Sequence, residues 1–299
     1  MSGPARLSLG PVLYFWEADR LRDFYFRIAE ETDVEIVYLG EVVCGKRLPF
    51  LSEALGAAAE RLRAAGKEVV LSSLALPGER RDLAALRELA ATADGPVEAN
   101  DFGAVRLLRG RPHVLGPYLN VYNEGTLAVL ARNGAVRCCP PPELPATAFA
   151  RLVAGSRLEF ELQIFGRQPL ALSARCYHAR SRGRRKDNCQ YACGEDADGM
   201  PVETLDGRAF VAVNGIQTLS AGYVELSAAV EEARAMGVGI FRLMPQALDM
   251  VAVIGLYRAL LEARIAPVEL RARLAELAPG TAFADGYWHG CAGMARLAG

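Results

Sequence analysis

The sequence has no excess of charge of either sign and no long apolar run. Its 299 residues carry 34 Lys and Arg against 35 Asp and Glu, a formal net charge of −1. Such a balance supplies no whole-molecule field to attract nucleic acid or an anionic membrane. The longest stretch without a charge, 209–224, contains Asn and Gln, and it is shorter than the roughly 20 apolar residues of a transmembrane helix. We therefore expect neither a membrane span nor a broad basic face.

Histidine is also scarce, with only His113, His178 and His289 in the chain. The sequence holds neither a Gly-x-Ser-x-Gly elbow nor a His-Glu-x-x-His pair, so serine-hydrolase and zinc-peptidase chemistry are not indicated. Cys176 lies two residues before His178, but a nucleophile and base so close in sequence are not a recurring arrangement. We do not expect a peptidase.

A secretion signal is not indicated at the amino-terminal end of the sequence. The apolar run 7–16 is interrupted by Gly10 and Pro11 and is followed by charged residues, where a signal peptide would have a small-residue cleavage site. We expect a cytoplasmic protein, in which thiols stay reduced.

Strand-like and helix-like segments alternate along the chain. A composition of 52% hydrophobic and 23% charged residues is that of a folded domain. Buried strands at 34–39 and 68–74 flank an amphipathic helix at 51–63. Further strands are predicted at 7–15, 113–121, 134–139, 157–165, 209–213 and 238–243, and further helices at 20–30, 79–93, 124–132, 145–154, 225–236 and 247–263. The alternation predicts a parallel sheet, and about eight such units favour an α/β fold of the TIM-barrel, (β/α)8, type spanning 1–299 as a single domain.

One region, 175–205, interrupts this alternation. It has no apolar periodicity and is rich in Arg, Asp, Gly and Cys. Loops of this length inside a compact domain are usually functional. We therefore interpret 175–205 as a loop insertion with a binding role.

The insertion contains three of the seven cysteines, in the pattern Cys176-x12-Cys189-x3-Cys193. Thiolates near positive charge ionise easily and can converge on one metal ion or cluster. A fourth ligand is predicted at Cys44, because it follows the strand at 34–39 and the carboxyl ends of barrel strands carry sites. Gly45 allows close approach of the backbone there.

The other three cysteines and the type of metal are less constrained by the sequence. Cys138 and Cys139 are adjacent on a strand and point to opposite faces, and Cys291 lies in a Gly/Ala-rich stretch; we interpret all three as structural.

The cysteine spacing does not choose between zinc and iron–sulfur. The basic run 180–186 favours an iron–sulfur cluster, whose net negative charge it would offset. Contact of this run with RNA phosphate is the alternative.

Several segments together resemble a known family. They are 9–16 (LGPVLYFW), 38–47 (YLGEVVCGKR), 174–180 (ARCYHAR), 186–193 (KDNCQYAC) and 214–218 (NGIQT). The sequence resembles the anaerobic ubiquinone-biosynthesis members of the collagenase-like peptidase family. The resemblance implies a barrel-like fold and a [4Fe-4S] cluster held by four cysteines, Cys44, Cys176, Cys189 and Cys193.

The resemblance also implies an activity and partners. It implies oxygen-independent hydroxylation of the ubiquinone-precursor ring by a heterodimer with a UbiU-like paralogue. Prephenate is implied as the source of the hydroxyl oxygen, and a sterol-carrier-like protein as the lipid-handling partner. Stable membrane insertion is not implied, and the charge balance makes nucleic acid a poor partner.

Two alternatives stay open at this stage. The chain could be a cluster-containing component of tRNA or rRNA base hydroxylation, or a non-catalytic subunit that transfers electrons or stabilises a partner. The helix at 248–261 is apolar nearly all round, and it is expected either to be buried or to cover a partner. We name no catalytic residue, but polar candidates for the rim of the site are Lys46, Arg175, Asn214 and Gln217.

Overall fold

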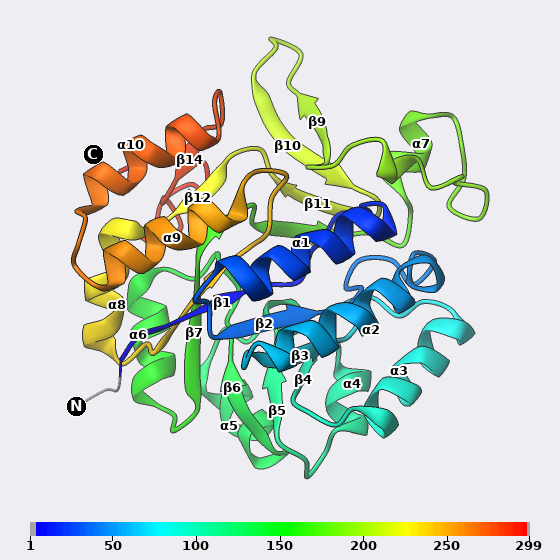
Figure 1. Ribbon diagram of the computed structural model, residues 1–299, viewed down its shortest axis with the longest axis horizontal. Coiled ribbons are helices and arrows are strands. Elements are labelled where there is room, and N and C mark those ends of the chain that lie inside the picture. The colour runs from blue at the N-terminus through cyan, green and yellow to red at the C-terminus, as the bar shows by residue number, and fades with distance from the viewer. Residues whose placement is uncertain (1–3, 298–299) are drawn as a thin grey trace.

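The computed structural model describes residues 4–297, and its central feature is a closed parallel barrel (Figure 1). Eight strands follow one another around it, and β13 pairs with both β1 and β7 to close the ring. They are β1 (Arg6–Leu9), β2 (Ile36–Leu39), β3 (Glu68–Ser72), β4 (Val97–Ala99), β5 (His113–Leu115), β6 (Ala135–Cys138), β7 (Glu159–Gly166) and β13 (Ile240–Leu243). The predicted single-domain TIM-barrel fold is confirmed.

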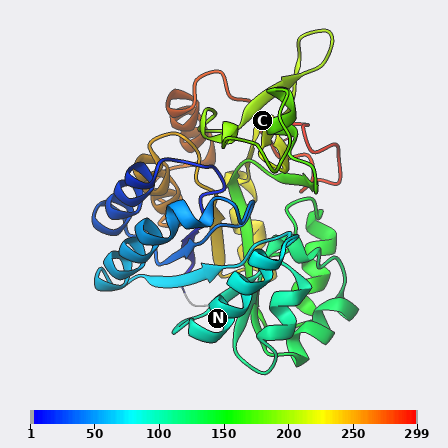
Figure 2. The same cartoon turned by 90° about the vertical axis from the view of Figure 1, so that its right-hand side faces the viewer.

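Helices cover the outside of the barrel (Figures 1 and 2). They are α1 (Ala18–Glu31), α2 (Leu48–Ala64), α3 (Arg80–Thr92), α4 (Phe102–Leu107), α5 (Glu124–Arg132), α6 (Ala146–Ala154), α8 (Val230–Met236), α9 (Met250–Leu261) and α10 (Pro267–Leu277). In α2, Leu51, Ala58 and Leu62 are buried, as their helical spacing predicts. Asp101 begins α4 by accepting hydrogen bonds from two backbone amides. The apolar helix α9 packs against α1, α10 and β1.

The barrel interior combines an apolar cluster with a buried ion network. Ile36, Tyr38, Val70, Val114 and Ile240 form one buried cluster. A second group is charged: the Arg242 guanidinium lies 2.8 Å from a Glu98 oxygen and 2.9 Å from a Glu161 oxygen, and all three side chains are almost fully buried. Buried charges of this kind require partners with good geometry.

An inserted antiparallel sheet follows β7 at the carboxyl end of the barrel (Figure 2). Its strand order is β8-β11-β10-β9, and it is separate from the barrel sheet. Its elements are β8 (Pro169–Leu172), α7 (Tyr177–Ser181), a short 3-10 helix (Ala192–Gly194), β9 (Met200–Glu203), β10 (Ala209–Asn214) and β11 (Gln217–Ser220). The chain then returns through β12 (Tyr223–Glu225), which pairs with β7 and with β14 (Phe283–Ala284).

Some predicted elements differ from those observed. The predicted strand at 209–213 belongs to the inserted sheet and not to the barrel. The barrel strand β4 was not predicted, because a strand of three residues is too short to show an alternating pattern. The segment 175–205, predicted to be a loop, contains α7, the 3-10 helix and β9. No helix in residues 4–297 is both long and apolar enough to cross a membrane.

Candidate metal centre

The four cysteines predicted to form a site line one cavity. Cys44 comes from the loop between β2 and α2, and Cys176 precedes α7. Cys189 precedes the turn that leads into the 3-10 helix, and Cys193 lies within this helix. The space left among the lining side chains is small, about 20 Å³. Cys176 and Cys193 are each 8% exposed, whereas Cys44 and Cys189 are partly exposed. The fold thus joins two segments that lie more than a hundred residues apart in the chain.

Local backbone structure orients these thiols. The Cys176 Sγ accepts a hydrogen bond from the Ala179 amide at 3.4 Å, so this side chain caps the first turn of α7. Gln190 and Tyr191 both have left-handed backbone conformations, with φ of 49° and 54°. The Ala192 amide donates to the Cys189 carbonyl at 3.2 Å. This tight turn brings Cys189 and Cys193 to the same cavity.

Two basic side chains border the thiols. Lys46 Nζ lies 3.6 Å from Cys189 Sγ and donates to the carbonyls of Lys186 and Asp187 at 2.7 and 3.0 Å. The Arg47 guanidinium is 1% exposed and interacts electrostatically with Cys44 and Cys193. A negatively charged group among the four sulfurs would therefore face two cations that the protein has already placed there.

The pKa values of two thiols reflect burial. Burial raises the pKa of Cys44, and the nearby Arg47 charge opposes that rise. Burial also raises the pKa of Cys176, while the hydrogen bond from the Ala179 amide lowers it. Metal coordination deprotonates a thiol outright, so binding of a metal at this cavity would release protons.

Arg47 is held by groups from three parts of the chain. Its Nη1 donates to the Leu13 carbonyl and its Nη2 to Asn214 Oδ1, both at 2.9 Å, and Nη1 lies 3.7 Å from Glu41. Asn214 Nδ2 also donates to the Leu13 carbonyl, at 2.6 Å. Gln217 lies next along the inserted hairpin, where its amide accepts a hydrogen bond from Asn214. The inserted sheet is thereby connected to the barrel beside Cys44.

The polar candidates from the sequence divide into three groups. Lys46 borders the cavity. Asn214 and Gln217 are buried at 1% and 0% exposure, so they do not form an open rim. Arg175 is exposed and lines a basic surface that adjoins the cavity at Cys176, together with Arg180, Arg184, Arg185 and Lys186.

Sequence reasoning missed the roles of two residues, Arg47 and Glu41. A buried Arg adjacent to a predicted ligand resembles any basic loop residue in sequence, because its partners Leu13 and Asn214 are distant along the chain. The Glu41 carboxylate accepts hydrogen bonds from the amides of Val43 and Cys44 at 2.7 and 2.8 Å. An acidic residue just before a ligand, at the carboxyl end of a strand, is the only signal that could have found it.

The remaining cysteines lie outside the cavity. Cys138 and Cys139 are buried, and burial raises the pKa of both thiols, so they are poor nucleophiles. Cys291 is exposed. His178 is buried and forms a 2.8 Å hydrogen bond with Asp196, not with a thiol.

The donor set of the cavity is one that an iron–sulfur cluster can use. A structural zinc ion draws its thiolates to about 2.3 Å from the metal. An iron–sulfur cluster separates its thiolates, because irons and sulfides lie between them. Four cysteines around one cavity, with Lys46 and Arg47 beside them, supply the thiolates and the positive charge that such a negatively charged group requires.

A family model decides the relationship of this chain to known proteins. The model of peptidase family U32 matches residues 18–295. The chain belongs to peptidase family U32. In this U32 protein, the matched segment includes all four cavity cysteines and the whole inserted sheet.

Comparison with solved structures finds likenesses at low sequence identity. A phospho-2-dehydro-3-deoxyheptonate aldolase from Thermotoga maritima is 14% identical, with 94% of this chain and 72% of that chain covered and a TM-score of 0.47. A U32 peptidase structure is 11% identical, with coverage of 83% and 95% and a TM-score of 0.44. A tryptophan synthase from Pyrococcus furiosus is 13% identical, with coverage of 93% and 98% and a TM-score of 0.43. At such identities these likenesses concern the fold alone.

Proposed function

We propose that this U32 protein is the iron–sulfur subunit of an oxygen-independent hydroxylase that acts on the ubiquinone-precursor ring. The observation that carries the proposal is the convergence of Cys44, Cys176, Cys189 and Cys193 on one cavity with Lys46 and Arg47 beside it. Four thiolates would hold a [4Fe-4S] cluster, which supplies one-electron redox chemistry when bound.

The protein's own residues have separate tasks in this proposal. Lys46 and Arg47 offset the negative charge of four thiolates, and the amide of Ala179 donates to Cys176 Sγ. Asn214 and the Leu13 carbonyl fix the orientation of Arg47. These contacts fix the positions of the two cations relative to the thiols.

The assignment to the quinone pathway rests on the sequence motifs together with family membership. A UbiV-like subunit would work as a heterodimer with a UbiU-like paralogue, and a sterol-carrier-like protein would present the lipid-borne precursor. Prephenate would supply the hydroxyl oxygen. We propose a cytoplasmic protein, and we do not propose peptidase activity, because neither ring nitrogen of His178 is hydrogen-bonded to Cys176: Nε2 pairs with Asp196, and Nδ1 has no partner among residues 4–297.

One observation favours a second candidate, a component of RNA base hydroxylation. The surface beside Cys176 is lined by five basic residues, Arg175, Arg180, Arg184, Arg185 and Lys186. Such a surface could contact RNA phosphates. We rank it second because the whole chain has a net charge of −1 and the neighbouring Arg182 is paired with Glu195. A non-catalytic subunit that transfers electrons would use the same cavity.

The test is anaerobic co-expression with a UbiU-like paralogue, followed by an assay of prenylated phenol hydroxylation with prephenate present. The proposal expects a stable heterodimer and a hydroxylated product whose new oxygen does not come from O₂ or water. The matched pair of variants is Cys44→Ala and Cys291→Ala, of which only the first should abolish product. Hydroxylation of RNA bases without quinone product would support the second candidate and overturn the first.

A further inference from the structure

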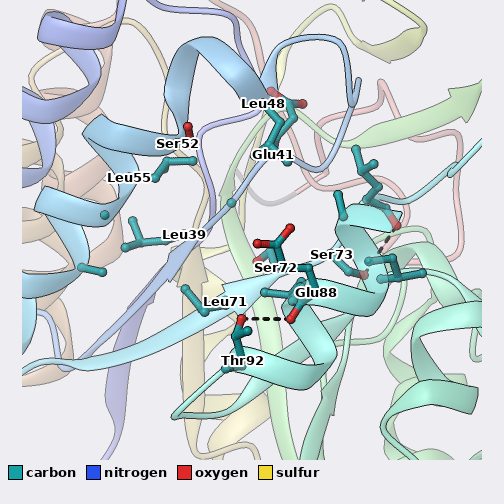
Figure 3. Close-up of a pocket in the computed structure, with 18 of the residues that line it drawn as sticks. Leu39, Glu41, Leu48, Ser52, Leu55, Leu71, Ser72, Ser73, Glu88 and Thr92 are labelled. Atoms are coloured by element: carbon teal, nitrogen blue, oxygen red, sulfur yellow. Dashed lines mark hydrogen bonds between the residues drawn. The ribbon is translucent and has the colours of Figure 1, made fainter. Parts of the chain in front are cut away.

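A groove lies on the outside of the barrel, between α2 and α3 (Figure 3). Its volume is about 580 Å³. In a (β/α)8 barrel, neighbouring helices normally pack on each other over the strand between them. Here α2 packs closely on α1 but makes few contacts with α3, so Leu71 of β3 is left partly exposed.

Apolar side chains form the floor and the walls of this groove. Leu71 lies in the middle of β3, yet it is only half-buried. Leu55 of α2 and Leu89 of α3 are also half-buried and line the same space, together with Leu39. Figure 3 shows Leu39, Leu55 and Leu71 directed into the opening between the helices. Apolar side chains left partly exposed in one concave space are typical of a ligand site.

The two ends of the groove differ in chemistry. At the carboxyl ends of the two helices, Arg63 and Asp94 both line the groove, and their side chains form an ion pair of 2.8 Å between α2 and the segment after α3. At the opposite end lie Glu41, Ser72 and Ser73 (Figure 3). Glu41 is the residue that accepts the Cys44 amide. The polar end of the groove is therefore adjacent to the loop that carries a cavity cysteine.

This shape selects among possible occupants. A partner helix has a diameter of about 10 Å, and it would have to clear the Arg63–Asp94 pair that ties the two sides together. A flexible aliphatic chain can lie along Leu71 without breaking that pair. At the polar end, the Glu41 carboxylate, which is paired with Arg47, offers no donor to an anionic head group, whereas it can accept a hydrogen bond from a hydroxyl.

We infer that the groove between α2 and α3 binds a long aliphatic chain whose neutral, hydroxyl-bearing head lies at Glu41. The inference deepens the proposed function, and it rests on that function only in identifying the chain as the tail of a prenylated phenol. Binding of the chain itself depends on Leu39, Leu55, Leu71 and Leu89 and not on the four cysteines.

Gly56 provides a variant that fills the groove. It lies in the middle of α2 and lines the groove, and a Cβ added there would meet no atom within 4 Å. Gly56→Leu therefore places a side chain in the groove, and it also replaces a poor helix former. Gly255 is the matched control, because it is a helical glycine of α9 with equally open surroundings and lies outside the groove.

The experiment measures displacement of the neutral fluorophore N-phenyl-1-naphthylamine from the full-length protein by farnesol, hexadecanol and palmitate. We expect one saturable site in the unchanged protein and in Gly255→Leu. Gly56→Leu should weaken binding by about tenfold or more, because its side chain replaces several methylenes of the ligand. Ala85→Phe, which fills the groove from α3, should behave like Gly56→Leu.

The outcomes separate the sources of the chain and the two proposals. Displacement by farnesol alone identifies a prenyl chain, and equal displacement by hexadecanol identifies any long-chain alcohol; both support the inference. Absence of saturable binding, equal affinity in Gly56→Leu and Gly255→Leu, or tighter binding of palmitate than of hexadecanol would overturn it. Iron content, measured on the same samples, should be unchanged in Gly56→Leu, so failure of chain binding is distinguishable from failure of the iron–sulfur proposal.

Discussion

Arg47 Nη2 donates a hydrogen bond of 2.9 Å to Asn214 Oδ1, and this contact joins the β2–α2 loop to the inserted sheet. Both side chains are 1% exposed. Cys44 lies three residues before Arg47, and Gly215, which lines the cysteine cavity, follows Asn214. The hydrogen bond therefore sets the position of the barrel loop relative to the insertion that carries the other three cysteines.

Removing the Arg47 guanidinium should destabilise the protein strongly. In Arg47→Met, the buried carboxylate of Glu41 loses the cation that lies 3.7 Å away, and Asn214 loses its donor. Breaking a buried pair by removing one partner costs about 3–5 kcal/mol, and we expect a decrease of that size in the free energy of unfolding measured with urea.

The control for this variant is Arg61→Met on the exposed side of α2. Arg61 pairs with Glu30, and both side chains are about half exposed. The change should stay within about 0.5 kcal/mol. Equal losses in the two variants would show that the buried contacts of Arg47 contribute no more than a surface ion pair.

A substitution at Gly215, in the hairpin of the inserted sheet, tests the contact between this hairpin and Arg47. Its φ is 64°, and an added Cβ would lie 2.8 Å from Arg47 Nη2. Gly215→Ala should destabilise the protein by more than the roughly 1–2 kcal/mol of left-handed strain alone, and it should lower iron loading. Gly207→Ala is the comparison, since Gly207 has a φ of 77° and no atom within 4 Å of the added Cβ. If the free energy of unfolding and the iron loading decrease equally in the two variants, the close approach of Gly215 to Arg47 has no effect on either quantity.

Features of the fold and of the site could be predicted from the sequence where the residues that determine them lie close together in the chain. The barrel followed from alternating strands and helices, because buried strands such as β2 and amphipathic helices such as α2 carry their pattern within a few residues. The four cysteines were predicted as a set from their spacing and family motifs, and they line one cavity. β4 was missed because three residues carry no periodicity.

Arg47 was not predicted for a different reason. Its environment consists of the Leu13 carbonyl and Asn214, which lie 34 and 167 residues away in the chain. The groove between α2 and α3 was not predicted for the same reason. In the sequence, Leu55, Leu71 and Leu89 have the pattern of ordinary core residues. Their partial exposure depends on the separation of α2 and α3, which the sequence pattern does not report.

Lowering the pH should destabilise the protein by protonating the buried carboxylate of Glu161 in the barrel interior. Burial alone would raise the pKa of Glu161. The positive charge of Arg242, together with hydrogen bonds from Arg242, Ser8 and Tyr38, holds the pKa below its ordinary value. A depressed folded-state pKa contributes stability that is present above the unfolded value of about 4.3 and is lost as the pH falls through the folded value.

The Glu161→Gln variant checks this account. At pH 7 it should lose about 3–5 kcal/mol of unfolding free energy, because Arg242 keeps only Glu98 as an acidic partner. Between pH 5 and pH 3 its unfolding free energy should fall less steeply than that of the unchanged protein. The exposed Glu231→Gln should leave the pH dependence unchanged, and a Glu161→Gln profile parallel to the unchanged protein would exclude a role for this carboxyl in acid denaturation.

The cysteines should separate into two classes when each is replaced by alanine. Change at Cys44, Cys176, Cys189 or Cys193 should remove the visible absorption of the anaerobically purified protein, since each thiol lines the cavity. Change at Cys138 or Cys291 should leave the absorption in place. Loss of absorption in Cys291→Ala, or its retention in Cys189→Ala, would mean that the ligand set is wrong.

The most direct measurement is the iron, sulfide and zinc content of the protein purified without oxygen. The account predicts about four irons and four sulfides per chain, as a [4Fe-4S] cluster requires, and no stoichiometric zinc. One zinc per chain without sulfide would contradict it.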